Sequence, residues 1–150
     1  MPAIWLLFCM INRATSLRIL LVDDEAFMRV FVGRVLTSSI NCTLEEARDG
    51  QDAINCCRTG DPELIILDIN MPRMDGVQAL SEIRALKPGT PIVMLTSNSE
   101  EAVVKECVTK GASYFIRKDV RADLLKTELL EMLRQLFPET QKPNEQPPTT

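Results

Sequence analysis

Five short runs of mostly apolar residues recur along this chain, and a longer stretch with helical periodicity follows each of them. The runs occupy 17–23, 42–47, 64–68, 91–96 and 113–118. Aliphatic runs with little polar alternation are typical of strands that are buried on both faces of a sheet. The pattern therefore predicts five strands, and those with continuous aliphatic runs are expected to be buried on both faces.

The stretches between and after these runs predict five helices, over 25–39, 51–59, 76–86, 99–111 and 121–137. Apolar residues recur at helical spacing in the first helix, at Phe27, Val30, Phe31 and Val35. The last helix carries a longer apolar series: Leu124, Leu125, Leu129, Met132, Leu133 and Leu136. A fivefold alternation of strand and helix favours the α/β class, with a parallel sheet covered by helices on both faces.

The two ends of the chain do not follow this pattern. Residues 1–16 form an N-terminal extension of unknown role that contains the apolar stretch MPAIWLLFCMI. This stretch is shorter than the roughly 20 residues that cross a bilayer, and it lacks the basic region of a signal peptide. We interpret it first as the result of a mis-assigned start, since Met10 offers a second one; an extra packing element and a membrane-surface anchor are the alternatives. Residues 138–150 are rich in Pro, Thr, Gln and Glu and predict a disordered tail, which leaves 17–137 as the domain.

Composition and charge narrow the class of protein. The 150 residues are 45% hydrophobic and 25% charged, which is ordinary for one globular domain, and the net charge is −4. Nucleic acid and membrane are not expected as partners, because phosphate contacts need clustered Lys and Arg and no run is long enough to span a bilayer. The five cysteines lack zinc-ligand spacing and are expected to be reduced thiols in the cytoplasm. Histidine is absent, so the chain contains neither a histidine-activated nucleophile nor a phosphohistidine.

Polar and charged side chains stand where four of the predicted strands end. They are Asp23 and Asp24, Asp68, Thr96 and Ser97, and Lys118. Ligands of doubly wound sheets bind beyond the carboxyl ends of the strands, near the switch point in strand order. We therefore expect these side chains to face one pocket.

This set of residues suits phosphoryl chemistry. Three carboxylates in one pocket repel one another, and Mg²⁺ fits such oxygen ligands together with phosphate oxygens. Thr96 can donate a hydrogen bond to a phosphoryl oxygen, and Lys118 can supply positive charge. A carboxylate can attack phosphorus to form an acyl phosphate, and Asp68 is the candidate.

Taken singly, these residues have simpler explanations. Asp23 or Asp24 can cap the helix that follows them, and Asp68 can be a turn residue. Asp75 is expected to be only a cap or turn residue. The combination of an acid pair, a single acid, a hydroxyl and a lysine at the ends of different strands favours the phosphoryl site.

The chain resembles the response-regulator receiver domain of two-component signalling in four motifs, ILLVDDE, LIILDINMPRMDG, PIVMLTS and GASYFIRK. The resemblance covers about 17–136, and LDINMPRMDG is nearly diagnostic by itself. It implies a flavodoxin-like doubly wound sandwich of five βα units, with the parallel strand order 2-1-3-4-5. It also implies Mg²⁺ as the cofactor.

The resemblance implies roles for the residues of the metal site. Asp68 matches the phosphoacceptor and also a metal ligand. Asp24 matches a direct metal ligand, and Asp23 matches its partner, which often acts through water. Asn70 is expected to lend its backbone carbonyl to the metal.

A second group of residues matches the family's switch. Thr96 matches the hydroxyl that moves toward the phosphoryl group, Lys118 the lysine that pairs with this group, and Phe115 the aromatic that turns inward. The chain departs from the family after the lysine, where proline is usual and Asp119 stands. A cis bond before a non-proline residue costs about 2.5–4 kcal/mol, so we expect a trans bond and an altered loop. Asp119 also places a negative charge next to Lys118, and we predict a weaker hold on the phosphoryl group.

The resulting expectation is a stand-alone receiver and not an enzyme, with self-phosphorylation and self-dephosphorylation as its only chemistry. Asp68 accepts a phosphoryl group from a histidine kinase or a phosphotransfer protein. Output is expected through protein–protein contact with a downstream target, and an exposed part of the last helix offers a contact for a homodimer.

Two alternatives stay open. A degenerate receiver would act as an unphosphorylated scaffold, and the presence of Asp119 leaves this alternative open. A haloacid-dehalogenase-type phosphatase also uses a strand-end aspartate with Mg²⁺. That chemistry usually needs a second Asp two residues later, where this chain has Asn70.

Overall fold

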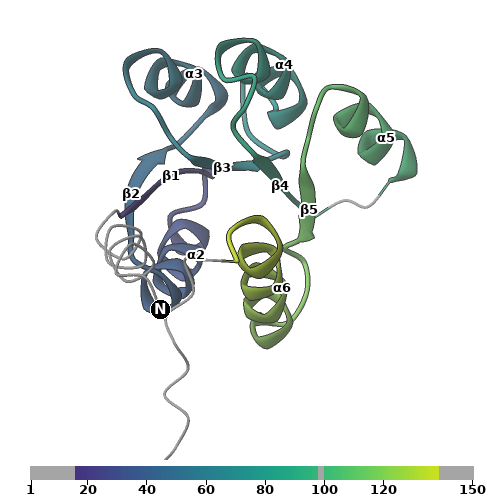
Figure 1. Ribbon diagram of the computed structural model, residues 1–150. Coiled ribbons are helices and arrows are strands. Elements are labelled where there is room, and N and C mark those ends of the chain that lie inside the picture. The colour runs from purple at the N-terminus through teal and green to yellow at the C-terminus, as the bar shows by residue number, and fades with distance from the viewer. Residues whose placement is uncertain (1–15, 98–99, 139–150) are drawn as a thin grey trace, which may run out of the picture.

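Strands and helices alternate along the chain in the computed structural model, which describes residues 16–97 and 100–138 (Figure 1). The strands are β1 (Leu17–Val22), β2 (Cys42–Ala47), β3 (Leu64–Asp68), β4 (Ile92–Thr96) and β5 (Tyr114–Arg117). The helices are α2 (Ala26–Ser39), α3 (Gly50–Thr59), α4 (Gly76–Leu86), α5 (Glu101–Thr109) and α6 (Ala122–Leu136). The predicted extension and tail lie outside the described residues, apart from Ser16 and Pro138.

The strands form one parallel sheet in the order β2-β1-β3-β4-β5, which confirms the predicted topology. Helices α2 and α6 cover one face, and α3, α4 and α5 cover the other (Figure 1). The chain leaves β1 toward β2 on one side and returns to β3 on the other. The switch point therefore lies between β1 and β3, where ligands of this architecture bind.

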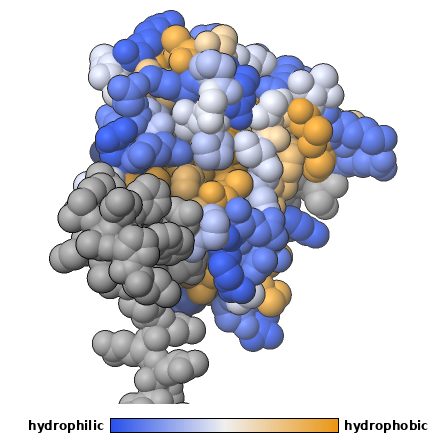
Figure 2. All heavy atoms as spheres, in the orientation of Figure 1, coloured by the Kyte–Doolittle hydropathy of each residue, from blue (hydrophilic) through white to orange (hydrophobic). Residues whose placement is uncertain are grey.

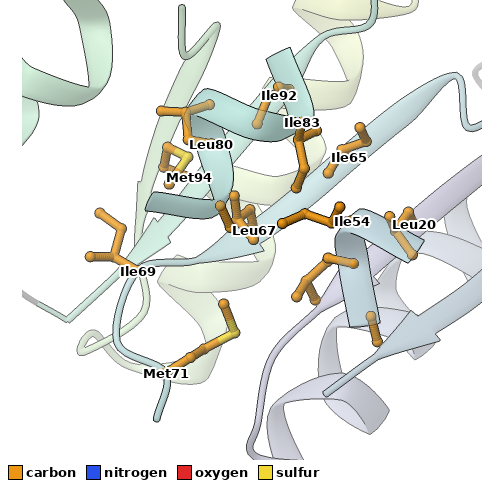
Figure 3. Close-up of a cluster of buried hydrophobic side chains, with 14 of the residues drawn as sticks. Leu20, Ile54, Ile65, Leu67, Ile69, Met71, Leu80, Ile83, Ile92 and Met94 are labelled. Carbon is orange, nitrogen blue, oxygen red and sulfur yellow. The ribbon is translucent and has the colours of Figure 1, made fainter. Parts of the chain in front are cut away.

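Two apolar clusters hold the helices on the sheet. The cluster under α3, α4 and α5 joins strand side chains to helix side chains (Figure 3), among them Leu20, Ile54, Ile65, Leu67, Leu80, Ile83 and Met94. The second cluster lies under α2 and α6 and includes Leu21, Ile66 and Leu129. Every residue of β3 and β4 is buried, as predicted for strands covered on both faces.

Three residues of the predicted apolar helix series lie on the surface. Phe27 is 77% exposed, and Val30 and Leu124 are each 51% exposed. The buried series of α2 includes Val32, and Val30 lies about 160° away from it around the helix; Leu124 lies about 100° from the buried Leu125. The predicted series therefore included positions outside the packed stripe. Figure 2 shows separate small apolar areas between hydrophilic ones on the face that it presents.

Candidate functional site

Asp68 is the last residue of β3, at the carboxyl edge of the sheet beside the switch point. Its side chain is fully buried. Carboxylate Oδ1 accepts a hydrogen bond from the Asn70 backbone N–H at 3.2 Å, and Oδ2 accepts one from the Lys118 ammonium at 2.9 Å. Both oxygens are thus oriented by donors from different parts of the chain.

Gly76 lets the start of α4 approach the backbone of Asp68 closely. A Cβ atom at Gly76 would overlap with the Asp68 carbonyl oxygen and would lie 2.7 Å from the Ile69 Cα atom. The Gly76 N–H donates to the Ile69 carbonyl at 2.8 Å. Asp75 caps α4 by accepting a hydrogen bond from the Gln78 N–H at 2.9 Å, so its predicted role is confirmed. The Asp-Gly pair therefore accounts for the compact connection that follows Asp68.

The acid pair follows β1 directly. Asp23 is fully buried, and its Oδ1 accepts a hydrogen bond from the Glu25 N–H at 2.9 Å, before α2 begins. Glu25 is the N-cap residue of α2, and its side chain makes no capping hydrogen bond. Asp24 is exposed and lines a surface hollow of about 780 Å³ together with Asn70. Helix capping therefore does not account for the acid pair.

Lys118, the first residue after β5, brings a positive charge to these acids. Its ammonium lies 2.9 Å from Asp68 Oδ2, 3.4 Å from Asp23 Oδ2 and 3.1 Å from Glu25 Oε1. Its side chain is only 6% exposed. One largely buried cation thus contacts three carboxylates.

Burial and mutual repulsion change the proton affinities of these groups. Burial, reinforced by the charge of Asp23, raises the pKa of Asp68 to about 7 although Lys118 opposes the shift. Burial also raises the pKa of Asp23. At Lys118 burial acts to lower the pKa, but the hydrogen bonds and charges of Asp68, Asp23 and Glu25 outweigh it and raise the pKa. The site therefore holds more negative charge than the single positive charge of Lys118 can neutralise.

The donor set fits a hard divalent cation. Oxygen atoms of Asp23, Asp24, Glu25 and Asp68 all lie within 4.8 Å of one another. Carboxylate oxygens are the ligands that Mg²⁺ prefers, and no histidine is present in the chain to favour a softer metal. The residues present thus fit the predicted Mg²⁺.

The predicted switch residues lie on β4 and β5, the two strands that follow β3 toward one edge of the sheet. Thr96 ends β4, is 2% exposed, and accepts a hydrogen bond through its backbone carbonyl from the Lys118 N–H at 2.9 Å. Phe115 of β5 pairs with Met94 in the sheet and is partly buried against the cluster under α3, α4 and α5. Ser97 accepts a hydrogen bond from the Asn70 side-chain amide at 2.7 Å.

Two residues of the site were missed from sequence. Glu25 contacts the Lys118 ammonium, and the run of three consecutive acids was the signal for it. Arg29 of α2 is 8% exposed; its guanidinium donates to the Asp23 backbone carbonyl at 2.7 Å and to Glu46 at 3.3 Å. A lone arginine among apolar residues was the available signal. Arg29 fixes the backbone that carries the acid pair.

The connection from β5 to α6 departs from the expected charge arrangement. No cis peptide bond occurs in the described part of the chain, so the Lys118–Asp119 bond is trans, as expected for this sequence. The carboxylate of Asp119 contacts the guanidinium of Arg117 at 3.0 and 2.7 Å. The negative charge of Asp119 is therefore bound by Arg117.

Comparison with known proteins decides the family. The family model described as response regulator receiver domain matches residues 19–130. The chain belongs to the response regulator receiver family. Over 107 residues it is 35% identical to the chemotaxis protein CheY of Listeria monocytogenes, covering 71% of this chain and 90% of that protein.

Solved structures of this receiver family share the fold. The response regulator domain of Thermotoga maritima CheB has a TM-score of 0.73 and 33% identity, covering 81% of this chain and 96% of that one. CheY in a CheX–CheY–BeF3–Mg²⁺ complex from Borrelia burgdorferi has a TM-score of 0.69 and 27% identity, covering 78% and 89%. Among the helices described for this receiver, none has the length and apolar character needed to cross a membrane.

Proposed function

We propose that this receiver accepts a phosphoryl group on Asp68 and signals through phosphorylation-dependent contact with other proteins. The observation that carries the proposal is the Lys118 ammonium 2.9 Å from a buried carboxylate oxygen of Asp68, inside a cluster of acidic oxygens. A buried lysine beside one strand-end carboxylate supplies positive charge where the phosphoryl oxygens would lie.

The proposed reaction transfers the phosphoryl group from a phosphohistidine of the donor protein to the carboxylate of Asp68. A carboxylate oxygen of Asp68 attacks phosphorus, the phosphorus–nitrogen bond of the donor phosphohistidine breaks, and the leaving imidazole keeps the electron pair and takes a proton. Mg²⁺ held by Asp23, Asp24 and Asp68, with the Asn70 backbone carbonyl, would supply positive charge to the phosphoryl oxygens. The Mg²⁺ of the Borrelia complex supports this choice of ion.

The residues of the chain orient the reacting group and transmit the change. The Asn70 N–H and the Lys118 ammonium hold the two oxygens of Asp68 in place, and burial limits competing water. The Thr96 hydroxyl then moves toward the phosphoryl oxygens and Phe115 turns inward. This shifts a two-state surface built from the β4–α5 and β5–α6 units.

The partners follow from this chemistry. This chain has no histidine, so the phosphohistidine belongs to a separate kinase or phosphotransfer protein. A role as a stand-alone receiver is supported by the match over 90% of the Listeria CheY chain, and the cytoplasm is the proposed location. A downstream protein, or a second copy of this chain, reads the altered surface.

Intact-mass measurement after incubation with Mg²⁺ and a small phosphodonor tests the proposal. We expect one phosphoryl adduct on the wild type and none on Asp68→Asn. Asp75→Asn is the matched control, because Asp75 caps α4 outside the acidic cluster and its variant should keep the adduct. A wild type that gains no adduct would favour the unphosphorylated scaffold, and steady hydrolysis of phosphoesters would favour the phosphatase.

A further inference from the structure

The last residue of β5 and the loop after it form a two-point ion pair. Arg117 Nε lies 3.0 Å from Asp119 Oδ1, and Arg117 Nη2 lies 2.7 Å from Asp119 Oδ2. Such a bidentate arrangement fixes the orientation of both groups better than a single contact does. The two side chains are 54% and 36% exposed, so the pair lies at the surface beside the candidate site.

Side chains alternate between the two faces of the sheet within β5, and Asp119 lies beyond the end of this strand. Ile116 packs in the cluster under α2 and α6, whereas Phe115 packs in the opposite cluster. β5 ends at Arg117, and in the bend that follows it the carboxylate of Asp119 turns back to the guanidinium of Arg117. Lys118, between them, contacts three other carboxylates.

We propose that Arg117 is a positioning residue: by binding Asp119 it keeps this carboxylate away from Lys118, whose ammonium stays with Asp68. The consequence for phosphorylation rests on the proposed function, and the placement of the charges does not. Hydrogen bonding to Arg117 lowers the pKa of Asp119. An aspartate is ionised at neutral pH even without such a partner. Without Arg117, a bare negative charge would stand one residue from Lys118.

That charge would act on the site in two ways. It would be a fourth carboxylate competing for a lysine that already contacts three. It would also repel an anionic phosphodonor that approaches Asp68. Arg117 thus compensates for the acid that replaces the family's usual proline in this loop.

The test measures the rate of phosphorylation by acetyl phosphate in four variants. Arg117→Gln should slow the reaction about threefold, the size expected for one exposed charge pair. Arg117→Gln/Asp119→Asn should return to the wild-type rate, because the released charge is gone. Asp119→Asn alone should be at least as fast as the wild type, because the Arg117 charge that it releases attracts the anionic donor.

Arg121→Gln is the matched control. Arg121 pairs with Asp123 at 3.0 Å with the same two-residue spacing, but farther along the loop and with greater exposure, so its loss should leave the rate unchanged. A double variant as slow as Arg117→Gln, or an Arg117→Gln rate equal to that of the wild type, would overturn the inference.

A crystal structure of Arg117→Gln tests the placement without any phosphorylation. We expect the Asp119 carboxylate to turn toward the Lys118 ammonium and the Lys118–Asp68 distance to lengthen. Asp119 pointing into solvent with the Lys118 contacts unchanged would overturn the inference, even if the wild type proves inert to phosphodonors. Inertness of the wild type contradicts the proposed function alone.

Discussion

The ammonium of Lys118 lies 2.9 Å from a carboxylate oxygen of Asp68, across a separation of 50 residues in sequence. The parallel sheet creates this contact, since Asp68 ends β3 and Lys118 follows β5 at the same edge. Burial makes the contact strong, because neither group is left with much water as a competing partner.

Removing Lys118 should lower the free energy of unfolding, because the buried acids then lack a counter-charge. Lys118→Met leaves Asp68 and Asp23 without their buried counter-charge, and we expect a loss of about 3 kcal/mol in the free energy of unfolding at pH 8. The loss should be smaller at pH 5, where the carboxylates can take up protons. Urea unfolding at both pH values measures it.

Lys87→Met is the control for this prediction. Lys87 pairs with Asp61 at 2.7 Å, but Asp61 is 84% exposed, so less than about 1 kcal/mol should be lost. Equal losses in the two variants at pH 8 would contradict the claim that the buried contacts of Lys118 stabilise the protein more than an exposed ion pair does.

The raised pKa of Asp68 makes stability depend on pH when Mg²⁺ is absent. The folded-state pKa of about 7 lies above the ordinary aspartate value of 3.8, so the folded state binds the proton more tightly than the unfolded state. The stability that this proton provides is present below about pH 4 and is lost as the pH rises through 7. The Asp68→Asn variant has no such proton, so it cannot lose this stability as the pH rises.

The stability of Asp68→Asn should therefore rise relative to that of the wild type between pH 4 and pH 8, by up to about 4 kcal/mol. Thermal or urea unfolding in the presence of a chelator measures this difference. A difference that stays constant over the whole range would show that the burial of Asp68 does not disfavour its charge.

Mg²⁺ binding should depend on the exposed acid of the pair. Asp24→Asn removes one oxygen ligand from the cluster and should weaken Mg²⁺ binding by at least about tenfold, measured by calorimetry. Asp75→Asn is the control, since Asp75 lines the same surface hollow but lies outside the oxygen cluster. Wild-type binding should be tighter at pH 8 than at pH 6, because Asp68 must lose its proton to become a ligand. Equal affinities in Asp24→Asn and wild type would remove Asp24 from the ligand set.

The glycine after Asp75 should tolerate no side chain. Gly76→Ala puts a Cβ atom into the Asp68 backbone, and we expect a loss of about 3 kcal/mol or more in the free energy of unfolding. Gly89→Ala is the control, because a Cβ atom there would meet nothing within 4 Å and should change stability by less than about 0.5 kcal/mol. Similar unfolding free energies for the two variants would contradict the close approach of α4.

The α/β class and the convergence of the strand-end residues could be predicted from the pattern, because strand and helix periods alternate regularly and parallel strands end at one edge. The strand order was implied only by the resemblance to the receiver family. The packed stripe of each helix was predicted less well. Phe27 and Leu124 are apolar but lie outside it, and composition alone does not fix the rotation of a helix.

The partners of charged residues were the least predictable part. Arg29 binds the backbone carbonyl of Asp23, and Asp119 pairs with Arg117. Both contacts depend on side-chain directions in three dimensions. Adjacent charges in sequence suggested that Asp119 would act on Lys118, whereas the structure pairs Asp119 with Arg117 and Lys118 with Asp68.

Locating the phosphoryl group within the chain tests the central claim most directly. Fragment mass spectrometry after phosphorylation in Mg²⁺ should find the adduct on Asp68, within the segment 64–76, and on no other acid. An adduct on Asp24 or Glu25, or an Asp68→Asn variant that is labelled as fast as the wild type, would contradict the account.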